Sequence, residues 1–430
     1  MPPGLRTTSR NLSRRPGRKL SGWLQPSVLP PAGLAAGAGF GQFLATATLA
    51  DVATGFSVSG AGDAALGLTD TTLGLGLSII RMGSLAALPL AALADRAGRR
   101  RVITGCAIAG LALTAGAALS PAFWWFVLIL ALARPLLSAT NAVALVVGAE
   151  VSAMEHRARA VSVIGAAYAV GAGVPVLLRA AFEGVGFRIL FGLALLPLAL
   201  IPFAAARLRE PERYAALHRE PPPATSRMRS RIPPGRRARL VLLGLLTAAA
   251  GFVSGPANTF AFYFAEEVRN LQPSAMALSV LAAGPVGLAG LLVGRWAADV
   301  LGRRVSAAVS LAGIGVAAFF TYNVGGAGVA IGYLLGMFAA SVYTPASGAL
   351  SAELFPTSCR STAAGWLTVA GVLGAVGGLA LFGFLADELG SFETAAASIA
   401  IPVILISLLY AALPETKGVE LDSDVPAGAL

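Results

Sequence analysis

The 430-residue chain is 56% hydrophobic and only 12% charged, with a mean hydropathy of +0.75. Soluble domains average about a quarter charged residues, so this composition excludes a soluble globular protein and predicts a polytopic membrane protein. The net charge of +11 does not indicate nucleic-acid binding, because the basic runs are not interleaved with aromatic side chains and cationic loops are expected of membrane proteins.

The apolar runs predict an all-α protein with twelve transmembrane helices, because a spanning helix needs about 20 apolar residues. The helices fall into two groups of six. The first six are expected at 35–60, 72–93, 101–119, 122–148, 160–181 and 186–206. The second six are expected at 240–265, 274–297, 304–322, 325–349, 362–385 and 390–412.

The segments outside the helices have distinct compositions. Residues 1–34 begin with a basic, Ser- and Pro-rich stretch that lacks the apolar core and cleavage site of a signal peptide, so they predict a disordered leader. Residues 207–239 contain ten arginines and two proline runs, which predicts a solvated linker. Helical bundles at 35–206 and 240–412 and a short acidic tail at 413–430 complete the predicted organisation.

The positions of Lys and Arg predict the orientation in the membrane. Of the 32 basic residues, 27 lie in the leader, the linker, the tail or loops on the same side. The opposite side has only Arg179, Arg188 and Arg269, and two further arginines fall inside helices. We therefore expect a multi-pass protein of the plasma (inner) membrane with both termini in the cytoplasm.

Charged landmarks recur at one offset along the chain. Asp95 and Asp299 are 204 positions apart, and Glu150 and Glu353 are 203 apart. Each of these glutamates is followed seven residues later by an arginine. This repetition predicts two six-helix halves related by parallel duplication.

The duplicated loops carry a family resemblance. Residues 95–100 read Asp-Arg-Ala-Gly-Arg-Arg and residues 299–304 read Asp-Val-Leu-Gly-Arg-Arg, which resembles the signature loop of the major facilitator superfamily. Residues 353–365 and 413–418 resemble motifs of its sugar porter and metabolite:proton symporter branches. The resemblance implies the major facilitator fold, with the solute site at the midplane between the halves.

The resemblance also implies a cytoplasmic gate. Carboxylates and guanidinium groups at helix ends can pair bidentately, and in this family such pairs are thought to latch the two halves together. The alternative is that they only signal topology and cap helices. The two sets are Asp95, Arg99, Glu150 and Arg157 in the first half, and Asp299, Arg303, Glu353 and Arg360 in the second.

Three ionisable residues fall well inside the predicted helices, away from the helix ends, where charge is costly and marks a functional site by default. They are Asp51, Arg81 and Arg134, in helices 1, 2 and 4. At 1.5 Å per residue, Arg81 lies about 21 Å and Arg134 about 24 Å from the cytoplasmic helix ends, beyond the middle of a core about 30 Å thick. Asp51 is expected within reach of either arginine.

Proton-coupled members of the resembling family have an aspartate in helix 1 and an arginine in helix 4, and Asp51 and Arg134 match those placements. The implied mechanism is that protonation of Asp51 from outside weakens its pair with Arg134 and lets the loaded cavity turn inward. Alternatively, Asp51 lies at the outer headgroups and Arg134 snorkels outward. Arg81 either binds an anionic substrate or pairs with Asp63 or Asp70.

The remaining substrate-binding candidates are uncharged, and each could instead serve packing or interhelical hydrogen bonding. They are Gln42 and Asn141 in the first half, and Asn258, Tyr263, Tyr343 and Trp366 in the second.

The function predicted from the sequence is secondary active transport, with protons, of a small sugar-like or anionic solute by a monomer in the lipid bilayer. We expect no cofactor, metal or enzymatic activity, because two cysteines and two histidines provide no ligand spacing. A drug:proton antiporter is the alternative, although residues 165–175 lack the Gly-Pro of its helix 5 signature. A non-transporting sensor with the same fold would need a larger signalling domain.

Overall fold

The computed structural model describes most of the two predicted bundles. The leader up to residue 25, the linker at 209–231 and the tail after residue 418 lie outside the described residues, as do the side chains of Asp95 and Arg157. The described residues are 26–56, 58–59, 65–66, 68–152, 157–182, 184–208, 232–356 and 359–418.

The first span is broken near its end. Helix α1 (Leu29–Ala47) and helix α2 (Leu49–Gly55) meet at Thr48, whose hydroxyl donates to the Leu44 carbonyl at 2.9 Å. This span begins six residues before its predicted start and ends five before its predicted end. A hairpin of two short antiparallel strands, β1 (Val58–Ser59) and β2 (Ala65–Leu66), follows it.

The other spans of the first half lie close to their predicted positions. The second combines α3 (Asp70–Gly83), η1 (Ser84–Ala86) and α4 (Ala87–Ala97). The next four are α5 (Arg99–Gly116) with η2 (Ala117–Leu119), α6 (Phe123–Val151), α7 (Arg157–Ala181), and α8 (Phe187–Gly192) with α9 (Leu195–Arg207).

The second half begins inside the segment predicted as linker, because its first helix starts at Pro234. Its spans are α11 (Pro234–Tyr263) with the π-helical η5 (Phe264–Val268), α12 (Pro273–Val300), α13 (Arg303–Asn323), α14 (Gly328–Glu353), α15 (Arg360–Leu389), and α16 (Phe392–Ile406) with η6 (Ser407–Ala412).

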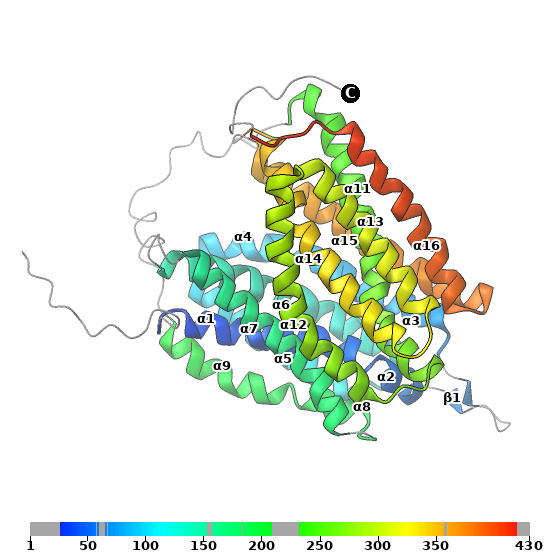
Figure 1. Cartoon of the computed structure of the whole chain (residues 1–430). Coiled ribbons are helices and arrows are strands. Elements are labelled where there is room, and N and C mark those ends of the chain that lie inside the picture. The colour runs from blue at the N-terminus through cyan, green and yellow to red at the C-terminus, as the bar shows by residue number, and fades with distance from the viewer. Residues whose placement is uncertain are drawn as a thin grey trace, which may run out of the picture.

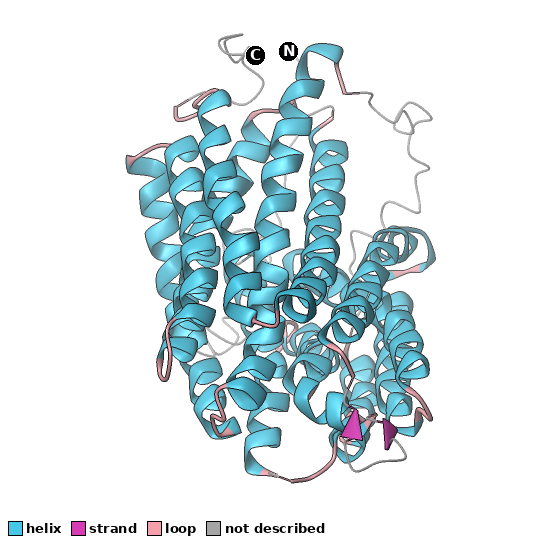
Figure 2. Ribbon diagram, turned by 90° about the vertical axis from the view of Figure 1, so that its right-hand side faces the viewer, coloured by secondary structure: helices cyan, strands magenta, loops and turns pink. Residues whose placement is uncertain are grey.

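Eleven helical stretches within the described ranges are long and apolar enough to cross a membrane, and α1 with α2 supplies the twelfth. The predicted all-α polytopic fold is confirmed. Figure 1 shows the first six spans, coloured blue to green, as one bundle and the last six, coloured green to red, as a second bundle set at an angle to it. Figure 2 shows the same two bundles from the side.

The same helix pair packs tightly in each half. The first span packs on the fifth, as α1 on α7 and as α11 on α15. A Cβ added to Gly39 would overlap the Tyr168 carbonyl, and one added to Gly251 would overlap the Gly371 carbonyl. Glycine therefore permits backbone contact at corresponding places in the two bundles.

The duplicated loop has one backbone conformation in both halves. Gly98, between α4 and α5, has φ 99°, and Gly302, between α12 and α13, has φ 97°. Residues with a side chain rarely adopt a backbone conformation with positive φ, so the shared glycine of the two loop motifs permits the tight turn. The Glu415 carboxylate also accepts from the N–H of Arg303 at 2.8 Å and of Arg304 at 3.1 Å.

Two ends of the molecule differ in how the halves meet. We call the end with Arg99, Glu150, Arg303 and Glu353 the terminal end, and the end with α2 and η5 the distal end. A buried apolar cluster at the distal end contains residues of both halves, including Phe126, Phe187, Phe260 and Phe382. Two other clusters, towards the terminal end, each belong to one half. The bundles thus share a core distally. Figure 1 shows their helices diverging towards the terminal end.

Candidate functional site

An ion-pair network joins the halves at the distal end. Arg179 pairs bidentately with Asp51 of its own half, with Nε–Oδ2 and Nη2–Oδ1 distances of 2.6 and 2.8 Å. Its Nη1 also donates to Oε1 of Glu266 in the other half. The side chains of Arg179 and Glu266 are only 10% and 9% exposed, and that of Asp51 is 26% exposed. We call these three residues the distal triad.

Local backbone features position the distal triad. Asp51 lies on α2, beyond the break at Thr48, and Arg179 lies in the last turn of α7. Glu266 lies in η5, a π-helical turn of five residues that ends the long α11 span. Single π-helical turns are frequent at functional sites because they change the direction of side chains within a helix.

A second set of contacts joins α3 to α15. The Asp387 carboxylate accepts from the N–H of Asp70 at 3.1 Å and of Thr71 at 2.7 Å, which caps the start of α3. Further along, the Ser78 hydroxyl donates to the Val376 carbonyl at 2.8 Å. A Cβ added to Gly383 would overlap the Asp70 carbonyl, so glycine permits this close approach.

A polar cluster lies in the first half near the middle of the spans. Arg134 of α6 donates to the Ser84 hydroxyl at 3.2 Å and to the backbone carbonyl of Gln42 at 3.0 Å. The Tyr168 hydroxyl of α7 donates to the Gln42 side-chain oxygen at 3.4 Å. Arg81 of α3 is close enough to Arg134 and Tyr168 to interact electrostatically with both. We call these five residues the central cluster.

A proline and a glycine bring α3 against α6 here. Pro135 lies inside α6 and has no N–H, so the Ala131 carbonyl lacks its usual helical donor. Gly83 lies against that carbonyl, where a Cβ would overlap it. The close approach places η1, with Ser84, beside Arg134.

The expected pair of Asp51 and Arg134 is absent from this structure, because both residues have other partners. Arg134 contacts the backbone of Gln42, which precedes Asp51 by nine residues, or about 14 Å of helix. The expectation treated the first span as one helix that lines the cavity. The structure instead places Asp51 past the break at Thr48, against Arg179.

The uncharged residues predicted to bind substrate do not lie together in one site. Gln42 belongs to the central cluster, and Asn141 lies seven residues after Arg134, on the same face of α6, with a buried side-chain oxygen that has no hydrogen-bond partner. Tyr263 packs against Phe260 and Phe392 near the distal end.

Two more candidates lie away from the central cluster. The Tyr343 and Tyr410 hydroxyl groups are 2.8 Å apart inside the second half. Trp366 is 59% exposed on α15.

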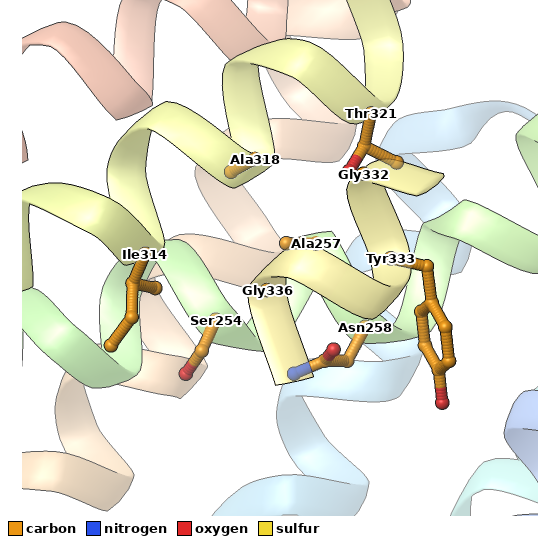
Figure 3. A pocket seen from close by; sticks show the side chains of 9 residues that line it. All are labelled: Ser254, Ala257, Asn258, Ile314, Ala318, Thr321, Gly332, Tyr333 and Gly336. Carbon is orange, nitrogen blue, oxygen red and sulfur yellow. The ribbon is translucent and has the colours of Figure 1, made fainter. Parts of the chain in front are cut away.

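Asn258 lines a small hollow that lies within the second half, between α11, α13 and α14 (Figure 3). The other lining residues include Ser254, Thr321 and Tyr333. The hollow does not lie between the halves, so it is separate from the central cluster.

The predicted gate residues whose side chains the structure describes form ion pairs or hydrogen bonds within their own halves. Arg99 pairs with Glu150 between α5 and α6. In the second half, Arg303 Nε lies 3.5 Å from Glu353 Oε1, and Arg303 Nη1 lies 3.5 Å from Asp299 Oδ1. Arg360 donates to the Ala352 carbonyl at 2.7 Å. The counterpart pairs repeat in the two halves, as the sequence offsets predict.

Comparison with known proteins identifies the family. A family model described as Major Facilitator Superfamily matches residues 32–320, more than half of the chain. The chain belongs to the Major Facilitator Superfamily. A second model, described as Sugar (and other) transporter, matches residues 224–423. Both describe membrane transporters, so the protein is a superfamily transporter and not an enzyme.

Known proteins resemble this chain in sequence or in fold. A Haemophilus influenzae protein named "Putative metabolite transport protein" is 26% identical over 347 residues, which are 77% of this chain and 84% of that protein. The inward open xylose transporter XylE from E. coli aligns with a TM-score of 0.73 and 18% identity over 92% of this chain and 97% of that one. A D-xylose-proton symporter aligns with a TM-score of 0.74 and 16% identity, over 92% and 99% of the two chains.

For a Major Facilitator Superfamily transporter, the distal triad and the central cluster are the two sites of interest. Sequence reasoning found Asp51, Arg81, Arg134 and Gln42 but missed several of their partners. The missed residues are Ser84, Tyr168, Arg179 and Glu266. The sequence offered one signal for Arg179. It is one of only three basic residues on the side opposite the predicted cytoplasmic side, where helix ends also have acidic residues that it could pair with.

Proposed function

We propose that this transporter carries a small organic solute together with protons by alternating access in the plasma (inner) membrane. In this proposal the terminal end faces the cytoplasm, because 27 of the 32 Lys and Arg residues lie on that side. The shared distal core and the separate terminal cores then describe a protein that is closed to the outside. The similarity to an inward open xylose transporter supports this assignment.

The distal triad is the observation on which proton coupling rests. One guanidinium faces two carboxylates, so the cluster has a net charge of −1 when both Asp51 and Glu266 are ionised. When the Arg179–Glu266 pair separates, Glu266 loses its cation in a partly buried site, where uncompensated charge is costly, so a proton replaces the lost cation. Because the Arg179–Glu266 pair joins the two halves, protonation and the separation of the halves are linked.

The geometry suggests an order of steps. When the distal end opens, Glu266 loses Arg179 and binds a proton from outside, since an unpaired carboxylate in this apolar setting favours the neutral form. When the distal end closes, the guanidinium of Arg179 returns to Glu266 in place of the proton, which leaves towards the space between the halves. One cycle therefore moves a proton inward with the solute.

The ion pairs at the terminal end have the complementary role in this proposal. Arg99 with Glu150, and Arg303 with Glu353, hold the helix ends of each half in position. When the molecule is open to the outside, these charged ends meet across the halves and stabilise the closed cytoplasmic side. The solute path is thus closed at the distal end by the distal triad in one conformation and at the terminal end by the charged helix ends in the other.

Proton flux into vesicles tests this proposal. Purified protein in liposomes that contain a pH-sensitive dye is supplied with D-xylose, D-glucose, succinate, lactate or citrate. A transported solute is expected to acidify the lumen in the wild type. With Glu266→Gln, uptake of the same solute should continue down its gradient without acidification. The surface variant Arg188→Gln serves as the matched control and should behave as wild type.

Other outcomes would contradict the proposal. Alkalinisation of the lumen would indicate a proton antiporter, and uptake without any pH change in the wild type would indicate a facilitator. Persistence of acidification in Glu266→Gln, with its loss in Asp70→Asn, would move the coupling site to the acidic pair Asp70 and Asp387, which also faces across the halves.

A further inference from the structure

The central cluster contains two neighbouring guanidinium groups without a carboxylate. Arg134 hydrogen-bonds only to neutral oxygens, and Arg81 has a buried Nε without a hydrogen-bond partner. In the described part of the chain, neither arginine forms an ion pair, whereas Arg179, Arg269 and Arg303 each pair with an acid. Arg81 and Arg134 are thus a local excess of positive charge.

Both arginines lie near the middle of the membrane. Each is eleven residues from the distal start of its span, Asp70 for Arg81 and Phe123 for Arg134, or about 16 Å along the helix. That is about half of a hydrocarbon core roughly 30 Å thick. Unpaired cations at this depth are costly, which predicts that a diffusible anion completes the cluster.

The central cluster faces the other half of the molecule. Arg81 lies one helical turn after Ser78, whose hydroxyl contacts Val376 across the halves, so the two residues share a face of α3. Gln42 is next to Phe43, whose ring meets Phe262 of the second half at a centroid distance of 6.0 Å. These inter-half contacts lie on the distal side of the arginines and close the space between the bundles there.

The residues around the arginines are suited to bind an oxyanion. The two guanidinium groups present planar donors, and the hydroxyl groups of Ser84 and Tyr168 lie within the same cluster. Paired guanidinium donors match the two oxygens of a carboxylate better than the scattered hydroxyl groups of a sugar. Sugar recognition would not require two unpaired charges.

We propose that the transported solute is a small organic carboxylate that binds between Arg81 and Arg134, with Tyr168 and Ser84 as additional partners. The inference rests on the proposed function only in taking the space between the halves as the solute path. A monocarboxylate that enters with one proton carries no net charge across the membrane, and a dicarboxylate carries one negative charge fewer than the anion alone. This charge compensation fits the inward proton movement assigned to the distal triad.

Thermal unfolding of the purified full-length protein in detergent tests the proposal with matched pairs of probes. Succinate is compared with succinamide and lactate with lactamide, and D-xylose is the neutral sugar. At least one carboxylate is expected to raise the unfolding temperature, because a ligand that binds the folded state stabilises it, and its amide is expected not to. Equal stabilisation by the amide, stabilisation by D-xylose alone, or no stabilisation by either carboxylate would overturn the proposal.

Variants of the two arginines locate the site. Arg81→Gln and Arg134→Gln are each expected to weaken carboxylate binding about ten- to a hundredfold, the effect of losing a charged hydrogen bond. Arg134→Lys keeps the charge and should lose less affinity, which separates binding from misfolding. Arg188→Gln is the matched control, because the Arg188 guanidinium donates to the backbone carbonyls of Ala118 and Ser120 and lies over the rings of Phe56 and Phe187, away from the central cluster. Unchanged binding in both Gln variants would exclude this site.

The test is independent of proton coupling, because binding in detergent requires no gradient. Glu266→Gln should therefore retain carboxylate binding even though it loses solute-driven acidification of vesicles. If carboxylates bind the wild type and the arginine variants do not, the inference stands even when no proton flux is observed. If proton flux accompanies a neutral sugar, the proposed function stands and the inference fails.

Discussion

The two ends of this transporter use the same chemical groups in different ways. At the terminal end, Arg99–Glu150 and Arg303–Glu353 are corresponding pairs, and each lies within one half. At the distal end, Arg179 contacts Asp51 in one half and Glu266 in the other, and the set has no duplicate among the described residues. Duplicated pairs maintain the structure of each half, whereas the unique set connects the halves.

This difference matters for function because only contacts between the halves change the balance of conformations directly. A pair within a rigid bundle is present in both conformations and cancels from their energy difference. In the proposed cycle, the distal triad is made in one conformation and broken in the other. Substitutions at the two ends should therefore have effects of different size and sign.

The largest effect is expected for Arg179→Gln, which leaves Asp51 and Glu266 facing each other without a cation. Removing one partner of a buried ion pair costs about 3 kcal/mol, so the distally closed state should lose about a hundredfold in relative population. Distances between spin labels at Leu119→Cys and Ser274→Cys, both exposed at the distal end, would report the opening. The native cysteines, Cys106 and Cys359, are buried.

Arg179→Lys provides the matched control for this substitution. Lysine keeps the charge but cannot form the bidentate pair with Asp51, so an intermediate shift is expected. A distance distribution unchanged from wild type in Arg179→Gln would show that the distal triad does not hold the halves together.

A smaller effect of opposite sign is expected for Arg99→Gln. Loss of a charged hydrogen bond costs about 2 kcal/mol. In the proposed cycle, Arg99 also meets the other half when the terminal end is closed, so part of this cost should fall on that conformation. The same spin labels should then show more of the distally closed state. Arg101→Gln changes an exposed residue directly after the same loop motif and should have no effect. If Arg99→Gln also leaves the populations unchanged, its pair with Glu150 serves only the first half.

The smallest effect is expected for Asp387→Asn. The carboxylate caps α3 through the N–H groups of Asp70 and Thr71, and loss of such a cap costs about 1 kcal/mol. The Asp70 carboxylate lies close enough to repel Asp387, so part of this cost is offset when the charge is removed. Amide hydrogen exchange at the start of α3 should become faster in this variant. Protection equal to wild type would show that this cap contributes nothing measurable.

The sequence predicts the duplicated features well. Apolar runs locate twelve spans, and the matching offsets of Glu150 and Glu353 reveal two equivalent halves. The paired glycines Gly98 and Gly302 have the same unusual backbone conformation because the same turn is needed twice. Repetition supplies an internal check that a single sequence otherwise lacks.

The sequence predicts the unique contacts poorly. Asp51 was paired with Arg134 because their helices and approximate depths matched a family pattern, but depth along a helix depends on its breaks. The break at Thr48 moves Asp51 onto a separate short helix. Arg179 is 128 positions from Asp51 and 87 from Glu266, so only packing brings the three together. The central cluster likewise depends on Gly83 lying against the backbone of α6.

The π-helical turn η5 has a consequence for how little of the chain must move. A π-helix accommodates one more residue per turn than an α-helix, so a change to α-helical register would rotate the residues beyond the change by about 100° around the axis. Glu266, inside these five residues, would swing off Arg179 while α11 stayed packed on α15. A local change of helix winding at η5 would thus break the Arg179–Glu266 contact before the bundles rotate as rigid bodies.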